Sequence, residues 1–236
     1  MFETEIREGV LRLRRPGTRW LSTGWDGGRS RGETAYNVTV PEGWERTDLE
    51  EYATGRLEAA GFPFDGPVLL TGVSQEHARV ARYGSAVAVA TVGLSNPATL
   101  PVDPDGEPTG CRPGIAHEQP PPGTCNLFVG TTRDLDAGAL ANLLTVGTEA
   151  KTATLLSSVG FTGTTSDAVV AACDPSGEPT AFSGSATSVG DAVRACVREA
   201  ITASLQSRYT DEQPPASVAE ADYGVATTTT AEVFEP

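Results

Sequence analysis

The segment that most constrains the fold is the apolar run at residues 85–94, Ser-Ala-Val-Ala-Val-Ala-Thr-Val-Gly-Leu. It is rich in Val and Ala, and its side chains do not alternate between polar and apolar. Such a run is typical of a central strand that is covered on both faces. It is much too short to span a bilayer. The chain must therefore place other structure on both sides of a sheet, and 236 residues are enough to do so.

The order of the other patterns favours a mixed sheet. Strand-like runs come first, a helix follows, and the second half alternates strand, helix, strand and helix. We expect an α+β fold with a single domain, in which a mixed β-sheet packs against helices, or a layered α/β sandwich as an alternative arrangement. The expected helices cover residues 47–60, 134–158 with Asp134 as the cap, and 188–208 with Ser188 and Asp191 as a capping box.

Two segments differ in composition from this core, which spans residues 1–209. Residues 98–123 are rich in Pro and Gly and are expected to form a long insertion. Residues 210–236 are acidic and rich in Thr, Ala and Pro, and we expect a disordered tail there.

The charge of the chain reflects its solvent more than its partner. Acidic residues number 31 against 17 basic ones, for a net charge of -14. This sign argues against partners that are nucleic acids or anionic lipids. Acidity spread along the chain, with arginine in place of lysine, suits a protein kept soluble in concentrated intracellular salt, which screens carboxylate repulsion.

The first residues carry no basic segment followed by an apolar one, so no secretory signal is predicted. We expect a cytoplasmic protein without membrane insertion. The oligomeric state stays open, with a homo-oligomer as one alternative. The two histidines, His77 and His117, lie far apart, and none of the four cysteines has Cys-x-x-Cys spacing. No metal site is therefore expected.

Lys151 is the one lysine among the 17 basic residues. It lies in the helix expected at residues 134–158. Around the helix axis it is about 20° from Leu140, on a stripe of Leu, Gly, Ala and Thr residues. One interpretation is an apolar stem that buries itself while the ammonium group reaches water. The other is a site lysine that pairs with a carbonyl or phosphate of the substrate or has a lowered pKa.

Two hydroxyl-rich loops could serve the same chemistry. Gly-Thr-Thr-Ser-Asp at 163–167 leads into a buried strand, and Ser-Gly-Ser-Ala-Thr at 183–187 opens a helix. Either loop could present hydroxyls and amides to an anion, although Ser and Thr are also ordinary turn and capping residues. With Lys151 they would suit acyl transfer or amide hydrolysis. A phosphate-handling transferase is an alternative, but no Walker-type loop supports it.

Several segments together resemble the adenosylcobinamide amidohydrolases, over roughly residues 15–208. The most specific pair is Thr-Glu-Ala-Lys-Thr at 148–152 with Thr-Gly-Thr-Thr-Ser-Asp at 162–167. The low lysine content and acidity are similar to those of a member from a salt-loving archaeon. The further segments that carry the resemblance are 22–28, 35–38, 91–97, 126–129 and 183–190.

The resemblance implies a cobinamide-salvage enzyme of cobalamin synthesis. It would hydrolyse the amide between aminopropanol and the corrin ring of adenosylcobinamide, giving adenosylcobyric acid and 1-aminopropan-2-ol. No cofactor is implied, because cobalt enters only as part of the corrinoid substrate. The alternative is a non-catalytic corrinoid-binding protein of the same fold.

The catalytic roles are our own hypothesis from the residue types. We expect Lys151 and Asp167 to line the reacting centre, with Thr148 and Glu149 orienting Lys151 or a water. Glu149 is also the candidate general base, and Asn96 the candidate donor to the oxyanion. Trp25 is either a platform for the planar substrate or a packing residue. The expected substrate-binding residues are Thr164, Ser166, Ser185, Thr187 and Trp25.

Overall fold

The computed structural model describes residues 2–41, 48–102 and 123–236. Its main feature is one mixed sheet of eight strands in the order β4-β3-β2-β11-β8-β6-β5, with β1 paired to β2. The pairs β3–β4 and β8–β11 are parallel, and the others are antiparallel. The strands are β1 (Glu3–Arg7), β2 (Val10–Ser22), β3 (Gly28–Thr39), β4 (Val68–Thr71), β5 (Arg79–Tyr83), β6 (Ala86–Val92), β8 (Cys125–Thr131) and β11 (Ala168–Cys173).

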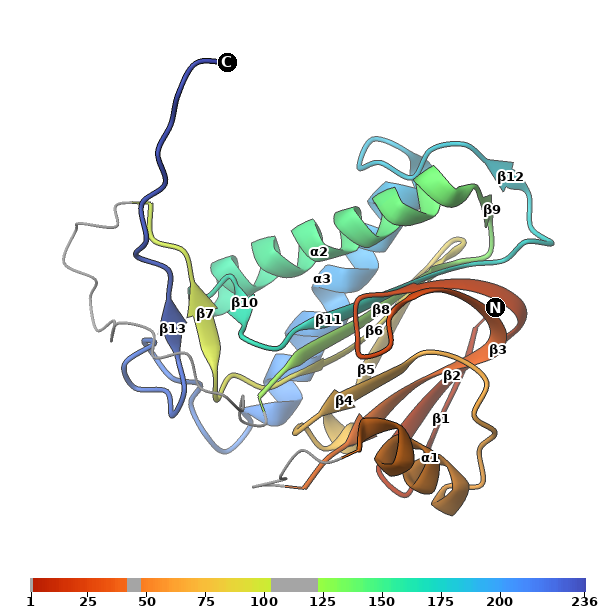
Figure 1. The fold of residues 1–236 in the computed structure, drawn as a ribbon, viewed down its shortest axis with the longest axis horizontal. Coiled ribbons are helices and arrows are strands. Elements are labelled where there is room, and N and C mark those ends of the chain that lie inside the picture. Colours follow the sequence, from red (N-terminus) through yellow and green to blue (C-terminus); the bar gives the residue numbers. More distant parts are fainter. Residues whose placement is uncertain (1, 42–47, 103–122) are drawn as a thin grey trace.

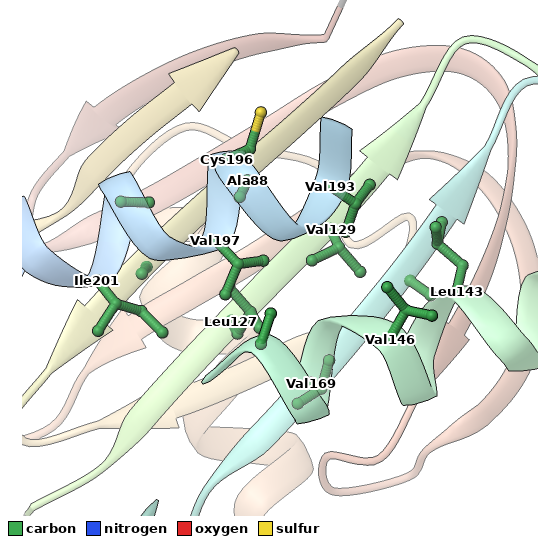
Figure 2. Close-up of a cluster of buried hydrophobic side chains, with 14 of the residues drawn as sticks. Ala88, Leu127, Val129, Leu143, Val146, Val169, Val193, Cys196, Val197 and Ile201 are labelled. Carbon is green, nitrogen blue, oxygen red and sulfur yellow. The ribbon is translucent and has the colours of Figure 1, made fainter. Parts of the chain in front are cut away.

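Strand β6 confirms the central-strand prediction, since every one of its residues is buried. Its Ala88 faces α2 (Ala137–Val159) and α3 (Ser188–Arg208), which cover one face of the sheet together (Figure 1). Figure 2 shows the contact between these helices and the sheet, where Leu143 and Val146 of α2 and Val193 and Ile201 of α3 reach the strands. Small alanines on β6 let α3 approach closely, which explains why this core contains few rings.

The opposite face of β6 is covered by the sheet itself. Val87 and Val89 belong to a cluster with Leu11 and Leu13 of β2 and Leu69 of β4. The half made of β1 to β4 therefore folds over β6, β8 and β11. The outer side of that half packs on α1 (Leu49–Ala59). The α+β prediction and the mixed sheet are confirmed, and the layers arise from one bent sheet between helices (Figure 1).

Two helix caps differ from the prediction. The side chain of Asp136, not Asp134, accepts from Ala139 N at the start of α2, because Asp134 lies in the two-residue strand β9 (Asp134–Leu135) and pairs with Arg19. Thr187 caps α3 in place of Ser188, one residue earlier than expected. In the N-terminal helix, Asp48 accepts from Glu51 N.

The segment after α3 differs from the expected disordered tail. Val218 is 4% exposed and packs on the α2–α3 core. Strand β13 (Val225–Ala226) pairs with β7 (Pro97–Thr99), which also pairs with β10 (Gly163–Thr164). The few apolar residues of this segment lie among many acidic residues and prolines, so its average composition predicted disorder. Residues 227–236 are exposed and have no regular secondary structure.

The remaining elements are short. They are the 3-10 turn η1 (Gln75–His77) and strand β12 (Pro179–Thr180), which pairs with β9. The expected insertion at 98–123 begins inside β7, but its residues 103–122, including His117, lie outside the described residues. No helix in the described ranges is long and apolar enough to cross a bilayer.

Candidate active site

A buried ion pair lies where α2 passes over the start of β11. Lys151 of α2 is 5% exposed, and its Nζ donates to Oδ2 of Asp167, the residue before β11. The lysine therefore lies in the apolar stripe as expected. It does not reach water, so the interpretation as a buried stem with a solvated ammonium group is wrong. Removing two charges from water is costly, and this pair persists because each member satisfies the other.

The second carboxylate oxygen of Asp167 is also occupied. Its Oδ1 accepts from the backbone N–H of Cys125 at 2.9 Å and from Thr164 Oγ1 at 2.5 Å. These three contacts come from α2, β8 and β10. Asp167 therefore fixes the ammonium group of Lys151 in place, and both of its carboxylate oxygens accept hydrogen bonds from other protein groups.

Cys125 lies directly beside this carboxylate. Burial, and to a smaller extent the negative charge of Asp167, raise the pKa of its thiol far above the usual range. The thiol stays protonated, and a buried neutral thiol is a poor nucleophile. Cys125 therefore contributes its backbone amide to the site, not its sulfur.

Gly163 makes room for the ion pair. A Cβ atom at this position would clash with the Asp167 carboxylate and lie 2.9 Å from Lys151 Nζ. The first glycine of the 163–167 loop is therefore required by close approach. In the sequence it appeared only as the first residue of a hydroxyl-rich loop.

We expect Gly163→Ala to destabilise the protein by about 1–3 kcal/mol, the usual range for overpacking a filled site. The methyl group must push Lys151 and Asp167 apart, so activity should fall with stability. Thermal unfolding and amide hydrolysis would be measured together. Gly55→Ala is the control, since no atom lies within 4 Å of the added methyl group in α1 and helix propensity favours alanine by about 1 kcal/mol. A Gly163→Ala protein as stable and active as wild type would contradict this packing argument.

Asn96 is fully buried next to the same loop. Its Nδ2 donates to Thr165 Oγ1 at 2.8 Å and to Ser166 Oγ at 3.2 Å, while Ser166 donates to the carbonyl of Gly123 at 2.9 Å. Asn96 Oδ1 is buried and has no hydrogen-bond partner in the described part of the chain. The side-chain N–H groups of Asn96 hold the 163–167 loop in this structure. Asn96 could therefore donate to an oxyanion only after it releases Thr165 or Ser166. That role stays a prediction.

A cavity of about 450 Å³ opens at Ser95, the residue before Asn96. Gly93, Leu94 and Ser95, which connect β6 to β7, form one wall. The opposite wall comes from the end of α3 and from the segment after it. This volume lies within the usual range for small-molecule sites. The cavity-lining residues from α3 onward are Arg208, Tyr209, Glu212, Gln213, Pro214, Pro215, Glu220, Ala221 and Asp222.

Glu149 and Thr148 lie away from the ion pair, contrary to the prediction. The Glu149 side chain is 58% exposed and lies 3.9 Å from Arg194 of α3. Thr148 Oγ1 donates to the carbonyl of Leu144, one turn earlier in α2. Neither side chain orients Lys151. The angular separation of Glu149 and Lys151 on the helix, about 160°, already pointed to this outcome.

The loop at 183–187 is at the other end of α2. Ser183 Oγ donates to Ala139 O at 2.6 Å, in the first turn of the helix. At a rise of 1.5 Å per residue, Lys151 lies roughly 18 Å further along the axis. Ser185 is exposed, and Thr187 is the cap of α3. The structure therefore does not bring Ser185 and Thr187 to the site with Thr164 and Ser166.

Trp25 lies in the turn between β2 and β3, which is fastened to the start of β11 by the hydrogen bond from Thr23 N to Val169 O at 3.0 Å. It is partly buried and packs on the cluster that includes Val68 and Leu57. Packing is thus one role of Trp25. Its role as a platform for the substrate stays a prediction.

Sequence reasoning missed a buried polar network between the two halves of the sheet. Asn37 of β3 donates to Thr91 Oγ1 of β6 at 2.9 Å, and Asn126 of β8 donates to Asn37 Oδ1 at 2.8 Å. Asn126 follows Cys125 in β8, so the network lies one residue away from the backbone amide that binds Asp167. Polar residues at interior positions of apolar strands were the available signal. In the described ranges, no three His, Cys, Asp or Glu side chains gather to hold a metal ion; a reaction without a protein-bound metal stays a prediction.

Comparisons with known proteins point to one family. Residues 2–213 match the family model described as adenosylcobinamide amidohydrolase. The chain is 58% identical, over the full length of both proteins, to the adenosylcobinamide amidohydrolase of Halobacterium salinarum. It is 29% identical to the adenosylcobinamide amidohydrolase of Methanosarcina mazei, over 80% of this chain and 90% of that protein.

Proposed function

Because the chain belongs to the adenosylcobinamide amidohydrolase family, we propose that it hydrolyses the amide between aminopropanol and the corrin ring of adenosylcobinamide. Water adds to the amide carbon, the C–N bond breaks, and the amine leaves with a proton. The products are adenosylcobyric acid and 1-aminopropan-2-ol. The observation that carries this proposal is the 58% identity over the full length of the Halobacterium salinarum enzyme.

We place the chemistry at Lys151. Its ammonium group is held by Asp167. A cavity of about 450 Å³ opens at Ser95, next in sequence to Asn96, whose side chain holds the 163–167 loop. A fixed positive charge in a water-poor site stabilises the negative charge that develops on an amide oxygen during attack. Asp167 is a positioning residue in this scheme, because its carboxylate holds Lys151 and is itself held by Cys125 N and Thr164. Cobalt takes part only as a component of the substrate.

The proposal is tested by incubating the purified full chain with adenosylcobinamide in molar KCl. Mass spectrometry should detect adenosylcobyric acid and 1-aminopropan-2-ol in equal amounts. Intact substrate together with quenching of tryptophan fluorescence would instead support the non-catalytic corrinoid-binding protein. Intact substrate without any quenching would remove corrinoids as ligands.

We also propose that the enzyme works in a cytoplasm rich in salt. Support comes from the 31 acidic residues, the scarcity of lysine and the Halobacterium relative. The described cysteines, Cys125, Cys173 and Cys196, are free thiols, as is usual in a reducing compartment.

We expect stability to fall when KCl is lowered from the molar range to tenths of a molar. The screening length grows from about 3 Å to about 10 Å over this range, so repulsion within a chain of charge -14 reaches further. A melting temperature lower by on the order of 10 °C corresponds to a few kcal/mol for a protein of this size. Calorimetry in KCl against an equal concentration of a neutral osmolyte separates screening from crowding. An unchanged melting temperature would contradict the expectation.

A further inference from the structure

Three arginines line a second cavity, of about 480 Å³, at the opposite end of α2 from Lys151. Arg19 of β2 lies directly across the antiparallel ladder from Arg31 of β3, and Arg29 lies two residues before Arg31. Alternate residues of a strand point to the same face, so all three share one face of the hairpin. That face is turned to the first turn of α2, where Ala137 and Leu140 complete the wall.

Arg29 and Arg31 differ from the other described arginines. Each of those contacts a carboxylate, a backbone carbonyl or a hydroxyl. The side chains of Arg29 and Arg31 have no hydrogen bond or ion pair within residues 2–41, 48–102 and 123–236. In a chain with a large excess of acid, two unpaired arginines side by side are unexpected, since carboxylates are abundant.

The positive charges of these arginines repel one another unless an anion lies between them. Like charges placed directly opposite in a ladder destabilise the sheet, and here Arg19 faces Arg31. Arg19 is partly neutralised, because its guanidinium contacts Asp134 and the carbonyl of Leu135, but its Nε is buried and has no hydrogen-bond partner among the described residues. Arg29 and Arg31 have no such relief in the same part of the chain.

The start of α2 adds further positive potential to the same cavity. Among the described residues of the wall, Asp136 is the one carboxylate, and its Oδ1 accepts from Ala139 N at 2.7 Å. The amide of Ala137 has no acceptor in the described part of the chain and lies at the positive end of a 23-residue helix. Backbone amides at such a position favour a negatively charged ligand group.

We propose that this cavity binds a phosphomonoester, with the phosphoryl group between Arg29, Arg31 and the start of α2. A tetrahedral dianion can accept from the guanidinium groups of the hairpin and, on its other side, from the amide at the start of α2, which a single planar carboxylate does less well. Ala137 and Leu140 supply apolar wall for the organic part of the ligand. At 1.5 Å per residue, the start of α2 lies roughly 21 Å from Lys151, so this site is separate from the amide hydrolysis site.

The test is a phosphorus NMR titration of the full chain in molar KCl. The probes are adenosine 5′-monophosphate and inorganic phosphate, with adenosine as a competitor without the phosphoryl group. We expect saturable broadening of the monophosphate signal that adenosine does not reverse. Equal affinity for both phosphates would support free phosphate as the ligand, and tighter binding of the ester would support an organic phosphate.

The double variant Arg29→Gln/Arg31→Gln should bind at least about tenfold more weakly, since each charge-assisted hydrogen bond contributes that much or more. Arg198→Gln on the exposed side of α3 removes one positive charge elsewhere and should bind like wild type. Both arginines of the double variant are exposed, so the fold should be retained, which circular dichroism checks. No saturable binding by wild type, or unchanged binding by the double variant, would overturn the proposal.

Discussion

Lys151→Met will lower kcat for release of 1-aminopropan-2-ol by at least about 100-fold, the typical loss when one group that stabilises an oxyanion is removed. Methionine keeps most of the apolar stem and removes the charge. The effect of Lys151→Met on stability must be separated from the loss of kcat. The substitution leaves Asp167 as an unpaired carboxylate whose side chain is 13% exposed. Breaking one partner out of a buried pair costs about 3–5 kcal/mol.

The double variant Lys151→Met/Asp167→Asn distinguishes a loss of catalysis from a loss of stability. The side-chain carbonyl oxygen introduced by the second substitution would still accept from Cys125 N and Thr164, while no charge remains buried. We expect most of the lost stability to return and activity to stay at least about 100-fold below wild type. Arg198→Gln serves as a variant that loses one exposed positive charge. If the double variant recovers activity together with stability, Lys151 is structural and the site must lie elsewhere.

The position of Lys151 illustrates what a helical pattern predicts. The period of the helix placed its side chain on the apolar face, and the same period placed Glu149 on the far side, where the structure has it. Glu149 therefore does not orient Lys151, and its role as general base stays a prediction. The identity of the partner, Asp167, required knowing which strand lies under α2, although its motif was already noticed.

Features that depend on strand register could not be predicted. The pairing of Arg19 with Arg31 follows from a register shift in the ladder between Arg14 and Thr18, which no local pattern announces. The contacts between Asn37 and Asn126 exist because the sheet bends back over itself. In contrast, β6 was predictable because a strand that is buried on both faces must be apolar along its whole length.

The segment after α3 shows a further limit of composition. An average over acids, threonines and prolines predicted disorder, yet a few apolar residues decide its position. Val218 lies in the core, and Val225 pairs with Ala98 of β7. The matched family region ends at residue 213, so this part of the fold lies outside it.

Removing residues 214–236 will lower kcat/KM by at least about tenfold and destabilise the protein by about 2–3 kcal/mol, the contribution of burying Val218. Residues 214–236 form part of the cavity wall and supply β13, the strand that pairs with β7. Tyr223 N donates to Ser95 O at 3.1 Å, Thr227 N donates to Thr99 O at 3.1 Å, and Pro214 lines the cavity wall. Without these contacts β7 loses one of its two partners.

The matched control is a chain that ends at residue 228, which removes only exposed residues. We expect this shorter truncation to keep the melting temperature and kcat/KM of wild type. The longer truncation should raise KM more than it lowers kcat, because it removes cavity wall while Lys151 and Asp167 stay paired through α2 and β11. Equal kcat/KM for the two truncations would mean that the cavity at Ser95 does not hold the substrate. A fall in kcat alone would instead mean that the segment acts through β7 on the reacting centre.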